Sequence, residues 1–297
     1  MGAAIPKRVM TLQFQLGQGA FGDSGADTIE VKGVRMSASI NRAGGLAMSQ
    51  LDLRVYGLEL SVMNKLTILG KPLVDNRHNT VIASAGEEGG PLSVVFAGTI
   101  IEAWVDAKGS PQVAFLVTAS DGAMFAMKPA VPVSFKGSVD AATVASYIAE
   151  TAGMGFENNG VSVQLSDPYL PNTGLEQLQT LGRAGNFNVL VETRGPSSST
   201  VVIWPYGKSR PGTVPEISPE TGLIGYPMRT QNGIELVTLF NPAIVFGGDL
   251  TVKSDITPAN GRWNVNQISH DLEAETPGGK WFTTAQCSLF GEVLATL

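Results

Sequence analysis

The sequence predicts a β-rich α+β protein in which a small α+β unit separates two β-rich regions. Apolar residues alternate with polar ones through the first region, take a helical spacing between about 138 and 185, and alternate again after about 222. Hydrophobic residues make up 43% of the chain and charged residues only 15%, which favours a large core and excludes a disordered chain. Glycine (35) and proline (17) are frequent, which indicates many turns.

The first region is predicted to form a β-barrel or sandwich. Residues 10–16 alternate strictly, as in a half-buried strand. A second alternating run, 29–40, changes phase at Gly33, which predicts a β-bulge or a bend at a barrel corner. The spacing over 58–66 predicts a short helix. Further strands are expected at 50–55, 79–85, 92–105 and 111–119.

The middle region is predicted to contain two helices and a hairpin. Ser138 is expected to cap the first helix, with Asp140 in its first turn and Gly153 at its end. Its apolar side is expected to carry Val144, Tyr147, Ile148 and Thr151. The second helix opens at Thr173, which forms a capping-box pattern with Glu176. Its apolar stripe is expected to be Leu175, Leu178 and Leu181, and a hairpin is predicted over 187–193 and 199–206.

The last region follows a proline-rich crossing and returns to strands. Four prolines between 205 and 219 predict a loop, because proline lacks the N–H that a strand donates. Asn260-Gly261 is a strong signal for a tight hairpin turn. Trp263 and Trp281 are expected to anchor the core of this region or a subunit interface. The predicted domains are therefore 1–136, 137–209 and 210–297.

Composition argues against several classes of partner. A net charge of −6 and a pI near 5.0, with scattered Lys and Arg, argue against specific nucleic-acid binding. Cys287 is the only cysteine, so an internal disulfide and a cysteine-cluster metal site are excluded, and a reducing compartment is favoured. The N-terminal segment lacks a signal-peptide pattern, and 91–105 is too short for a span, so no export signal and no membrane anchor are expected.

Short motifs that resemble enzyme sites fail on mechanism. Gly17–Gly22 matches G-x-G-x-x-G, but a strand follows it where a dinucleotide site needs a helix N-terminus. A glycine-rich hairpin loop is therefore expected there. Gly22–Gly25 resembles the nucleophile segment of chymotrypsin-like proteases, whose histidine base precedes the serine. Both His78 and His270 follow Ser24, so the match is coincidental.

Carboxylate pairs are the remaining enzyme class to weigh. Glu87 and Glu88 lie in a glycine-rich turn, and Asp23 and Asp27 flank a loop, so solvated loops are expected for both pairs. His270 shares a strand face with apolar neighbours and is expected to be a core or interface residue. We therefore predict no enzyme activity and no catalytic, cofactor-binding or metal-binding residues.

An ordered series of short segments carries more information. In the last third these are Thr221–Pro227, Asn232–Leu236, Leu239–Pro242, Gly247-Gly248, Ala259–Val265, Ser269–Leu272 and Gly278–Thr284. Upstream, Val55–Leu58 and Val95–Ile100 fit the same series. Together these segments, which span most of the chain, resemble the baseplate hub proteins of contractile-tailed bacteriophages.

This resemblance implies two tail-tube-like β-barrel domains with a small α+β domain between them. It also implies a homotrimer, whose six barrels form a ring that adapts the six-fold tail tube to the three-fold central spike. Tail-tube or tube-initiator proteins above, the spike protein below, and tape-measure and wedge proteins are the implied partners. The implied location is the tail baseplate of the virion, after assembly in the host cytoplasm. An acidic lumen would let DNA or tape-measure protein pass without adhering.

Two alternatives to this hub role are an enzyme and a different structural protein. One is a tail-associated peptidoglycan hydrolase, and the other is a different tail-tip or tube-initiator protein or the hub of a phage-like injection system. A hydrolase needs a carboxylate pair lining a cleft outside the barrels, and only 137–209 has room for one. The acids there are Asp140, Glu150, Glu157, Asp167, Glu176 and Glu192.

Overall fold

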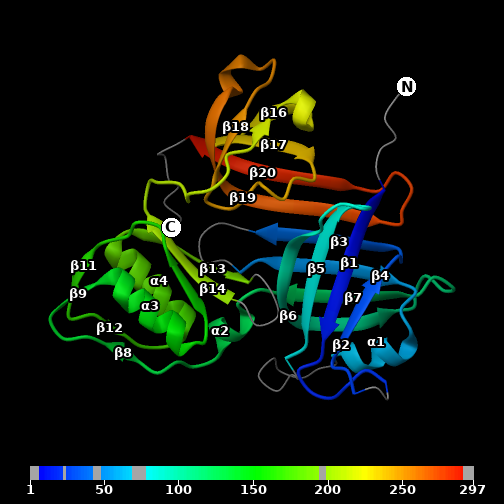
Figure 1. Ribbon diagram of the computed structural model, residues 1–297, viewed down its shortest axis with the longest axis horizontal. Helices are drawn as coiled ribbons and strands as arrows, with labels where there is room; N and C mark the ends of the chain where they lie inside the picture. Colours follow the sequence, from blue (N-terminus) through cyan, green and yellow to red (C-terminus); the bar gives the residue numbers. More distant parts are fainter. Residues whose placement is uncertain (1–6, 23–24, 43–47, 69–77, 194–198, 290–297) are drawn as a thin grey trace.

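Strands dominate the chain, as expected from its alternating pattern. The computed structural model describes residues 7–22, 25–42, 48–68, 78–193 and 199–289 (Figure 1). The first region contains β1 (Arg8–Gln15), β2 (Thr28–Lys32), β3 (Met36–Arg42), β4 (Gln50–Tyr56), α1 (Leu60–Leu66), β5 (Thr80–Glu87), β6 (Ser93–Asp106), β7 (Ala114–Ser120) and α2 (Ala123–Met127). Each predicted strand and the predicted short helix of this region is thereby confirmed.

The middle region contains the two predicted helices and the predicted hairpin. Its elements are β8 (Val133–Ser134), β9 (Ser138–Asp140), α3 (Ala141–Thr151), β10 (Gly155–Asn158), β11 (Gln164–Ser166), β12 (Tyr169–Leu170), α4 (Gly174–Gly185), β13 (Phe187–Thr193) and β14 (Ser199–Pro205). The final region contains β15 (Glu216–Ile217), β16 (Leu223–Arg229), β17 (Gly233–Leu239), β18 (Asp249–Val252), β19 (Gly261–Ala274) and β20 (Trp281–Leu289), with short 3₁₀ turns at Pro219–Thr221 and Thr257–Ala259.

One sheet runs through both β-rich regions. Its strand order is β16-β17-β20-β19-β3-β4-β7-β6-β5-β1-β2, with β18 and β15 attached beside β19. The two regions meet where β19 pairs with β3, from Ile268 opposite Arg42 to Ala274 opposite Met36. Among the described strands this path stays open, with β16 and β2 at its ends, and no closed barrel is formed.

Gly33 lies where the chain leaves one end of this path and enters its middle. Gly33 has φ +67°, a left-handed conformation that glycine adopts without a steric penalty. Before it, β2 pairs with β1; after it, β3 pairs with β4 and β19. The predicted change of phase therefore corresponds to a bend at Gly33 between two strands that pair with different neighbours.

The helix predictions are confirmed in position and corrected in detail. Asp140, not Ser138, caps α3, because its side chain accepts a 2.8 Å hydrogen bond from the Ala142 N–H while Ser138 is engaged in β9. Tyr147 and Thr151 are exposed, and alanines complete the buried side of α3: Ala141, Val144, Ala145, Ile148 and Ala149. The capping box of Thr173 and Glu176 is present at the start of α4.

Asn260-Gly261 does not form the predicted two-residue hairpin turn. The connection from β18 to β19 is longer and contains the turn Thr257–Ala259. The Asn260 side chain accepts a 2.7 Å hydrogen bond from the Ser254 N–H and donates a 3.0 Å bond to the Ser254 carbonyl. Asn260 thus closes the loop by side-chain bonding, and Gly261 is already the first residue of β19.

The buried side chains fall into three clusters. The first fills the space under β1–β7 and α1, the second lies under the final strands, and the third lies between α3, α4 and the β13–β14 hairpin. Trp263 belongs to the second cluster, as expected, whereas Trp281 packs in the first beside Leu272 and Ala274. Trp281 therefore anchors the junction of the two regions. The domain limits at 136 and 209 remain a prediction.

The β13–β14 hairpin lies between two of these clusters. Val189 and Val191 face the helices, while Leu190, the intervening residue, belongs to the second cluster. In β14, Val201 and Ile203 alternate in the same way with Val202 and Trp204. Since successive strand residues point to opposite faces, one hairpin connects the α+β region to the final strands.

Candidate assembly surfaces

The residues that resembled enzyme motifs are dispersed over the described structure. The stretch Gly17–Phe21 lies in the turn that connects β1 to β2, as expected for a glycine-rich loop. His78 is exposed and His270 is buried. Glu87, the last residue of β5, and Glu88, in the turn that follows, are both exposed. Asp27 accepts hydrogen bonds from Gln15 and Thr28. Asp23 and Ser24 lie outside the described residues.

The acids of the middle region are occupied by local hydrogen bonds. Asp140 and Glu176 cap helices, and Asp167 accepts a 2.7 Å bond from the Gly137 N–H. Glu150 and Glu157 accept bonds from Ser146 and Asn159, each at 2.8 Å. Within the described part of the chain, no group of three or more His, Cys, Asp or Glu side chains is arranged to hold a metal ion.

A charged cluster joins the three regions and was not found from sequence. Glu192 of β13 lies 3.5 Å from Arg42 at the end of β3 and 3.3 Å from Arg210, which follows β14. The Arg210 guanidinium also donates to the Phe246 carbonyl and lies over the Trp204 ring. Arg42 is far from Glu192 and Arg210 in sequence, so no pattern within a short window predicts the cluster. We call the cluster of Arg42, Glu192 and Arg210 the charged joint, because it connects the three regions of the chain.

His270 lies beside this joint and contributes to a small cavity of about 160 Å³ with Arg42, Glu192 and Ile268. Its Nδ1 is 2.9 Å from the Thr283 hydroxyl, and its ring contacts Phe240 edge-on. Burial, and secondarily the positive charge of Arg42, lowers the pKa of His270 to about 3. A neutral imidazole of this kind fits the predicted core histidine.

The strands of the junction share one polar face. Ser37 and Ser39 of β3 lie opposite Arg54 and Asp52 of β4, while the intervening residues are buried. The same face continues through Thr118 of β7 and through further charged residues of β19. These side chains line a shallow groove of about 380 Å³, and its charged members are Asp52, Arg54, Asp271, Glu273 and Lys280. We call this surface the polar sheet face.

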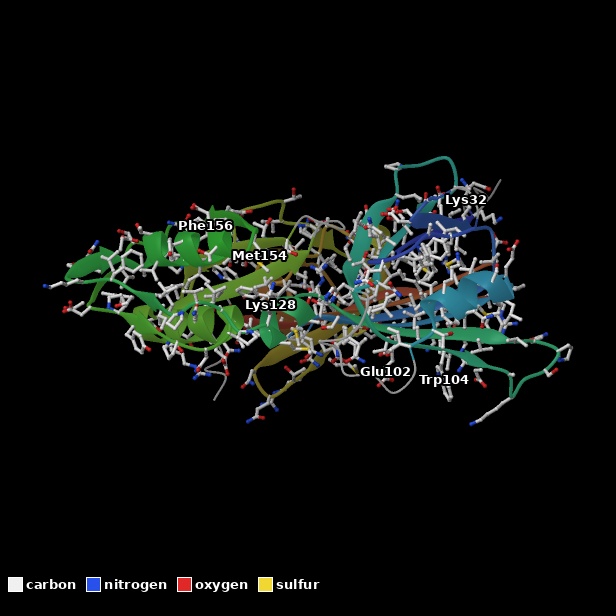
Figure 2. All side chains as sticks on the ribbon, turned by 90° about the horizontal axis from the view of Figure 1, so that it is seen from below. Lys32, Glu102, Trp104, Lys128, Met154 and Phe156 are labelled. Atoms are coloured by element: carbon white, nitrogen blue, oxygen red, sulfur yellow. The ribbon has the colours of Figure 1, made fainter. Side chains whose placement is uncertain are left out.

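Large apolar side chains are exposed at the two ends of the polar sheet face. At one end, Trp104 of β6 is 52% exposed and lies opposite Leu116 of β7. Figure 2 shows Trp104 and Glu102 projecting from the same side of the sheet. At the other end, four residues of β16 and β17 are exposed: Ile224, Tyr226, Met228 and Leu239. We call these four residues the β16 patch.

No described helix is both long enough and apolar enough to cross a membrane. The features described above are a polar sheet face, an exposed tryptophan, an apolar patch and a charged joint. An arrangement of this kind is suited to contacts with other protein chains, since contiguous exposed apolar residues with a polar rim mark such sites.

Solved structures of phage tail proteins share this fold. The 43 kDa tail protein of prophage MuSo2 from Shewanella oneidensis aligns with a TM-score of 0.62 at 10% identity, over 95% of this chain and 96% of that one. A tail protein from Neisseria meningitidis MC58 aligns with a TM-score of 0.62 at 9% identity, over 94% and 96%. The fold is therefore that of a phage tail protein.

A third similar structure comes from a secretion system. It is the E. coli c3393 protein, described as a component of the type VI secretion system with structural similarity to the T4 bacteriophage tail proteins gp27 and gp5. It aligns with a TM-score of 0.55 at 7% identity, over 86% of this chain and 73% of that one. No curated protein is significantly similar in sequence.

The sequence model of the baseplate hub gp41 family matches residues 12–287, which is nearly the whole chain. The chain therefore belongs to the baseplate hub gp41 family. This membership confirms the resemblance found from the sequence segments and gives the chain a structural role in the phage tail baseplate. The family is one of structural hub proteins.

Proposed function

We propose that this chain is the structural hub of a contractile-tail baseplate, in which three copies form a ring between the six-fold tail tube and the three-fold central spike. The observation that carries the proposal is the family match over residues 12–287 on a chain with the fold of phage tail proteins. On this proposal each copy contributes two tube-like β units, built on residues 1–136 and 210–297, with the α+β unit 137–209 beside them.

The proposed ring has no catalytic step of its own. Its role is to transmit load and to adapt symmetry between the tail tube or tube-initiator above and the spike below. The charged joint supports this role, because Glu192, Arg42 and Arg210 link all three regions through largely buried ion pairs. Tape-measure and wedge proteins are the further proposed partners, and host cytoplasm is the proposed place of assembly.

The polar sheet face is the proposed wall of the central passage. Its charged residues comprise three acids and two bases: Asp52, Asp271, Glu273, Arg54 and Lys280. A modest acidic excess repels DNA and keeps it from adhering during passage. A positive potential along the passage of the assembled ring would contradict this assignment.

The test is the solution mass of the 31.1 kDa chain, alone and mixed with its candidate spike protein. A trimer in either condition is expected. A chain that stays monomeric in both, and that is present in fewer than three copies per isolated particle, would contradict the hub proposal. A cell-wall zymogram then tests the hydrolase alternative directly, with clearing as the result that would favour it.

The similarity to a type VI secretion component supports a second candidate, the hub of a phage-like injection system. The two candidates predict the same ring and differ in the particle that contains it. Particles purified with an antibody against this chain would carry a DNA-filled capsid in the first case. Headless contractile particles would favour the second.

A further inference from the structure

The chain contains three Asn-Gly dipeptides, all within the described residues: Asn159-Gly160, Asn232-Gly233 and Asn260-Gly261. In such a dipeptide the backbone nitrogen of glycine can attack the side-chain carbonyl carbon of asparagine, because glycine has no Cβ to obstruct the approach. The reaction converts the carboxamide to a carboxylate. It requires that the carboxamide and the glycine N–H are both free to move, and the three sites differ in this respect.

Asn260 and Asn159 are held by hydrogen bonds. The Asn260 carboxamide accepts a 2.7 Å bond from the Ser254 N–H and donates a 3.0 Å bond to the Ser254 carbonyl. The Asn159 carboxamide donates a 2.8 Å bond to the Glu157 carboxylate, and its backbone N–H donates a 2.8 Å bond to the Ile203 carbonyl. Each of these side chains must break at least one bond before its Cγ can approach the glycine nitrogen.

Asn232 is exposed in the turn between β16 and β17, and its side chain makes no hydrogen bond to the residues that the structure describes. A 2.9 Å backbone bond from the Thr230 N–H to the Gly233 carbonyl closes the turn. The N–H and the carbonyl of a residue in an antiparallel pair point to the same neighbour, so the Gly233 N–H also faces this turn. Within the described chain it donates no bond to the Thr230 carbonyl. Both reacting groups are therefore without a partner in the turn.

The hairpin that carries Asn232 is held by few contacts. Two residue pairs adjoin the turn, Met228 with Glu235 and Arg229 with Ile234, and the register shifts beyond them. β16 is mostly exposed and, among the described strands, pairs with β17 alone, at the margin of the sheet (Figure 1). A segment with few buried contacts opens at a low free-energy cost. The turn can therefore reach the geometry that the reaction requires.

We propose that Asn232 is a site of spontaneous deamidation in the folded chain. The deprotonated backbone nitrogen of Gly233 attacks Asn232 Cγ, the new C–N bond closes a succinimide ring, and the side-chain nitrogen leaves as ammonia. Water then opens the ring. The product is aspartate when the bond from Cγ to the ring nitrogen breaks, and isoaspartate when the bond from the main-chain carbonyl carbon breaks.

The modification changes both charge and backbone. Either product adds one negative charge to a chain whose formal net charge is −6. Isoaspartate also lengthens the backbone by one methylene directly before Gly233. Gly233 is closely packed against β20, since a Cβ there would lie 2.1 Å from the Cys287 carbonyl oxygen. The isoaspartate form should therefore loosen the start of β17. The site is independent of the proposed hub role, so its failure would leave that proposal standing.

The decisive experiment compares the three sites within one sample. The full chain is incubated at mildly alkaline pH with and without urea, and peptide mass mapping follows the conversion of each Asn-Gly dipeptide. In the native chain Asn232 should react at least about tenfold faster than Asn159 and Asn260, roughly the factor that broken hydrogen bonds impose. In urea the three rates should become similar, which would show that the native difference comes from the structure.

Two variants sharpen the comparison. Asn232→Gln keeps the carboxamide but requires a larger ring, so its map should show no conversion at this position. Glu157→Ala removes the acceptor of the Asn159 carboxamide and should speed conversion of Asn159. Equal native rates at the three dipeptides would overturn the proposal. So would a native chain in which Asn232 stays intact over a period in which the urea-treated chain reacts.

Discussion

Glu192 and Arg210 form an ion pair of 3.3 Å between the α+β region and the crossing that follows it, with side chains only 12% and 9% exposed. Arg42, from the first region, approaches the other oxygen of the same carboxylate. A single carboxylate is therefore shared by two guanidinium groups from different parts of the chain. This joint is the place where one substitution affects all three regions.

Replacing Glu192 with alanine should lower the free energy of unfolding by about 3–5 kcal/mol, because two largely buried guanidinium groups lose a partner. Glu216 is the matched control, since its ion pair with Lys253 has side chains 44% and 64% exposed. Glu216→Ala should cost less than about 1 kcal/mol. Urea unfolding of both variants measures the difference, and equal losses would contradict the structural role of the joint.

His270 should make the protein less stable as the pH falls. Burial lowers the pKa of His270 to about 3 in the folded state, well below the unfolded value of 6.5. Between these two values the unfolded chain binds more protons, so stability is lost as the pH falls from 6.5 towards 3. At pH 4.5 this loss amounts to about 3 kcal/mol relative to neutral pH.

His270→Gln should remove most of this dependence and keep a polar group near Thr283. The comparison is the unfolding free energy of both proteins at pH 7 and pH 4.5. Burial raises the pKa of Asp121, so Asp121 has the opposite effect on stability as the pH falls. Because Asp121 is present in both proteins, its effect cancels in the comparison. An unchanged pH slope in the variant would show that another group is responsible.

Cys287 should be unreactive in the folded protein. Burial raises the pKa of the Cys287 thiol to about 12, so its thiolate is present at only about one part in 10⁴ at pH 8. Ellman's reagent should therefore label the native chain very slowly and should label one thiol per chain at once in denaturant. Rapid labelling of the native protein would mean that the C-terminal end of β20 separates readily from β17 and β19.

Gly233 should not tolerate a side chain. A Cβ at this position would lie 2.1 Å from the backbone carbonyl oxygen of Cys287, which cannot move without disturbing the β17–β20 pairing. Gly233→Ala should therefore cost roughly 1–3 kcal/mol or more, as overpacking does. Gly90→Ala is the control, because its nearest contact would be an ordinary 3.4 Å. Thermal unfolding of the two variants should separate them clearly.

Local sequence patterns predicted the helices and strands well because the interactions that form these elements involve residues close together in sequence. The alternation at 10–16 and the capping box at Thr173 need only neighbouring residues, and both are present in the structure. Two errors have the same origin. Ser138 and Asp140 are both acceptable caps, and only the pairing of β9 with β11 assigns Ser138 to a strand. Asn260-Gly261 is a turn signal that the longer β18–β19 loop uses differently.

The sequence by itself determined that the protein is β-rich, that a small α+β unit interrupts the strands, that His270 is buried, and that the chain resembles baseplate hubs. Tertiary structure alone decided that β19 pairs with β3, that Trp281 packs in the first core, and that Arg42, Glu192 and Arg210 meet. Most of these contacts join residues more than a hundred positions apart, such as Arg42 and Glu192. Their partners are selected by the packing of whole sheets, which no period or motif within a short window encodes.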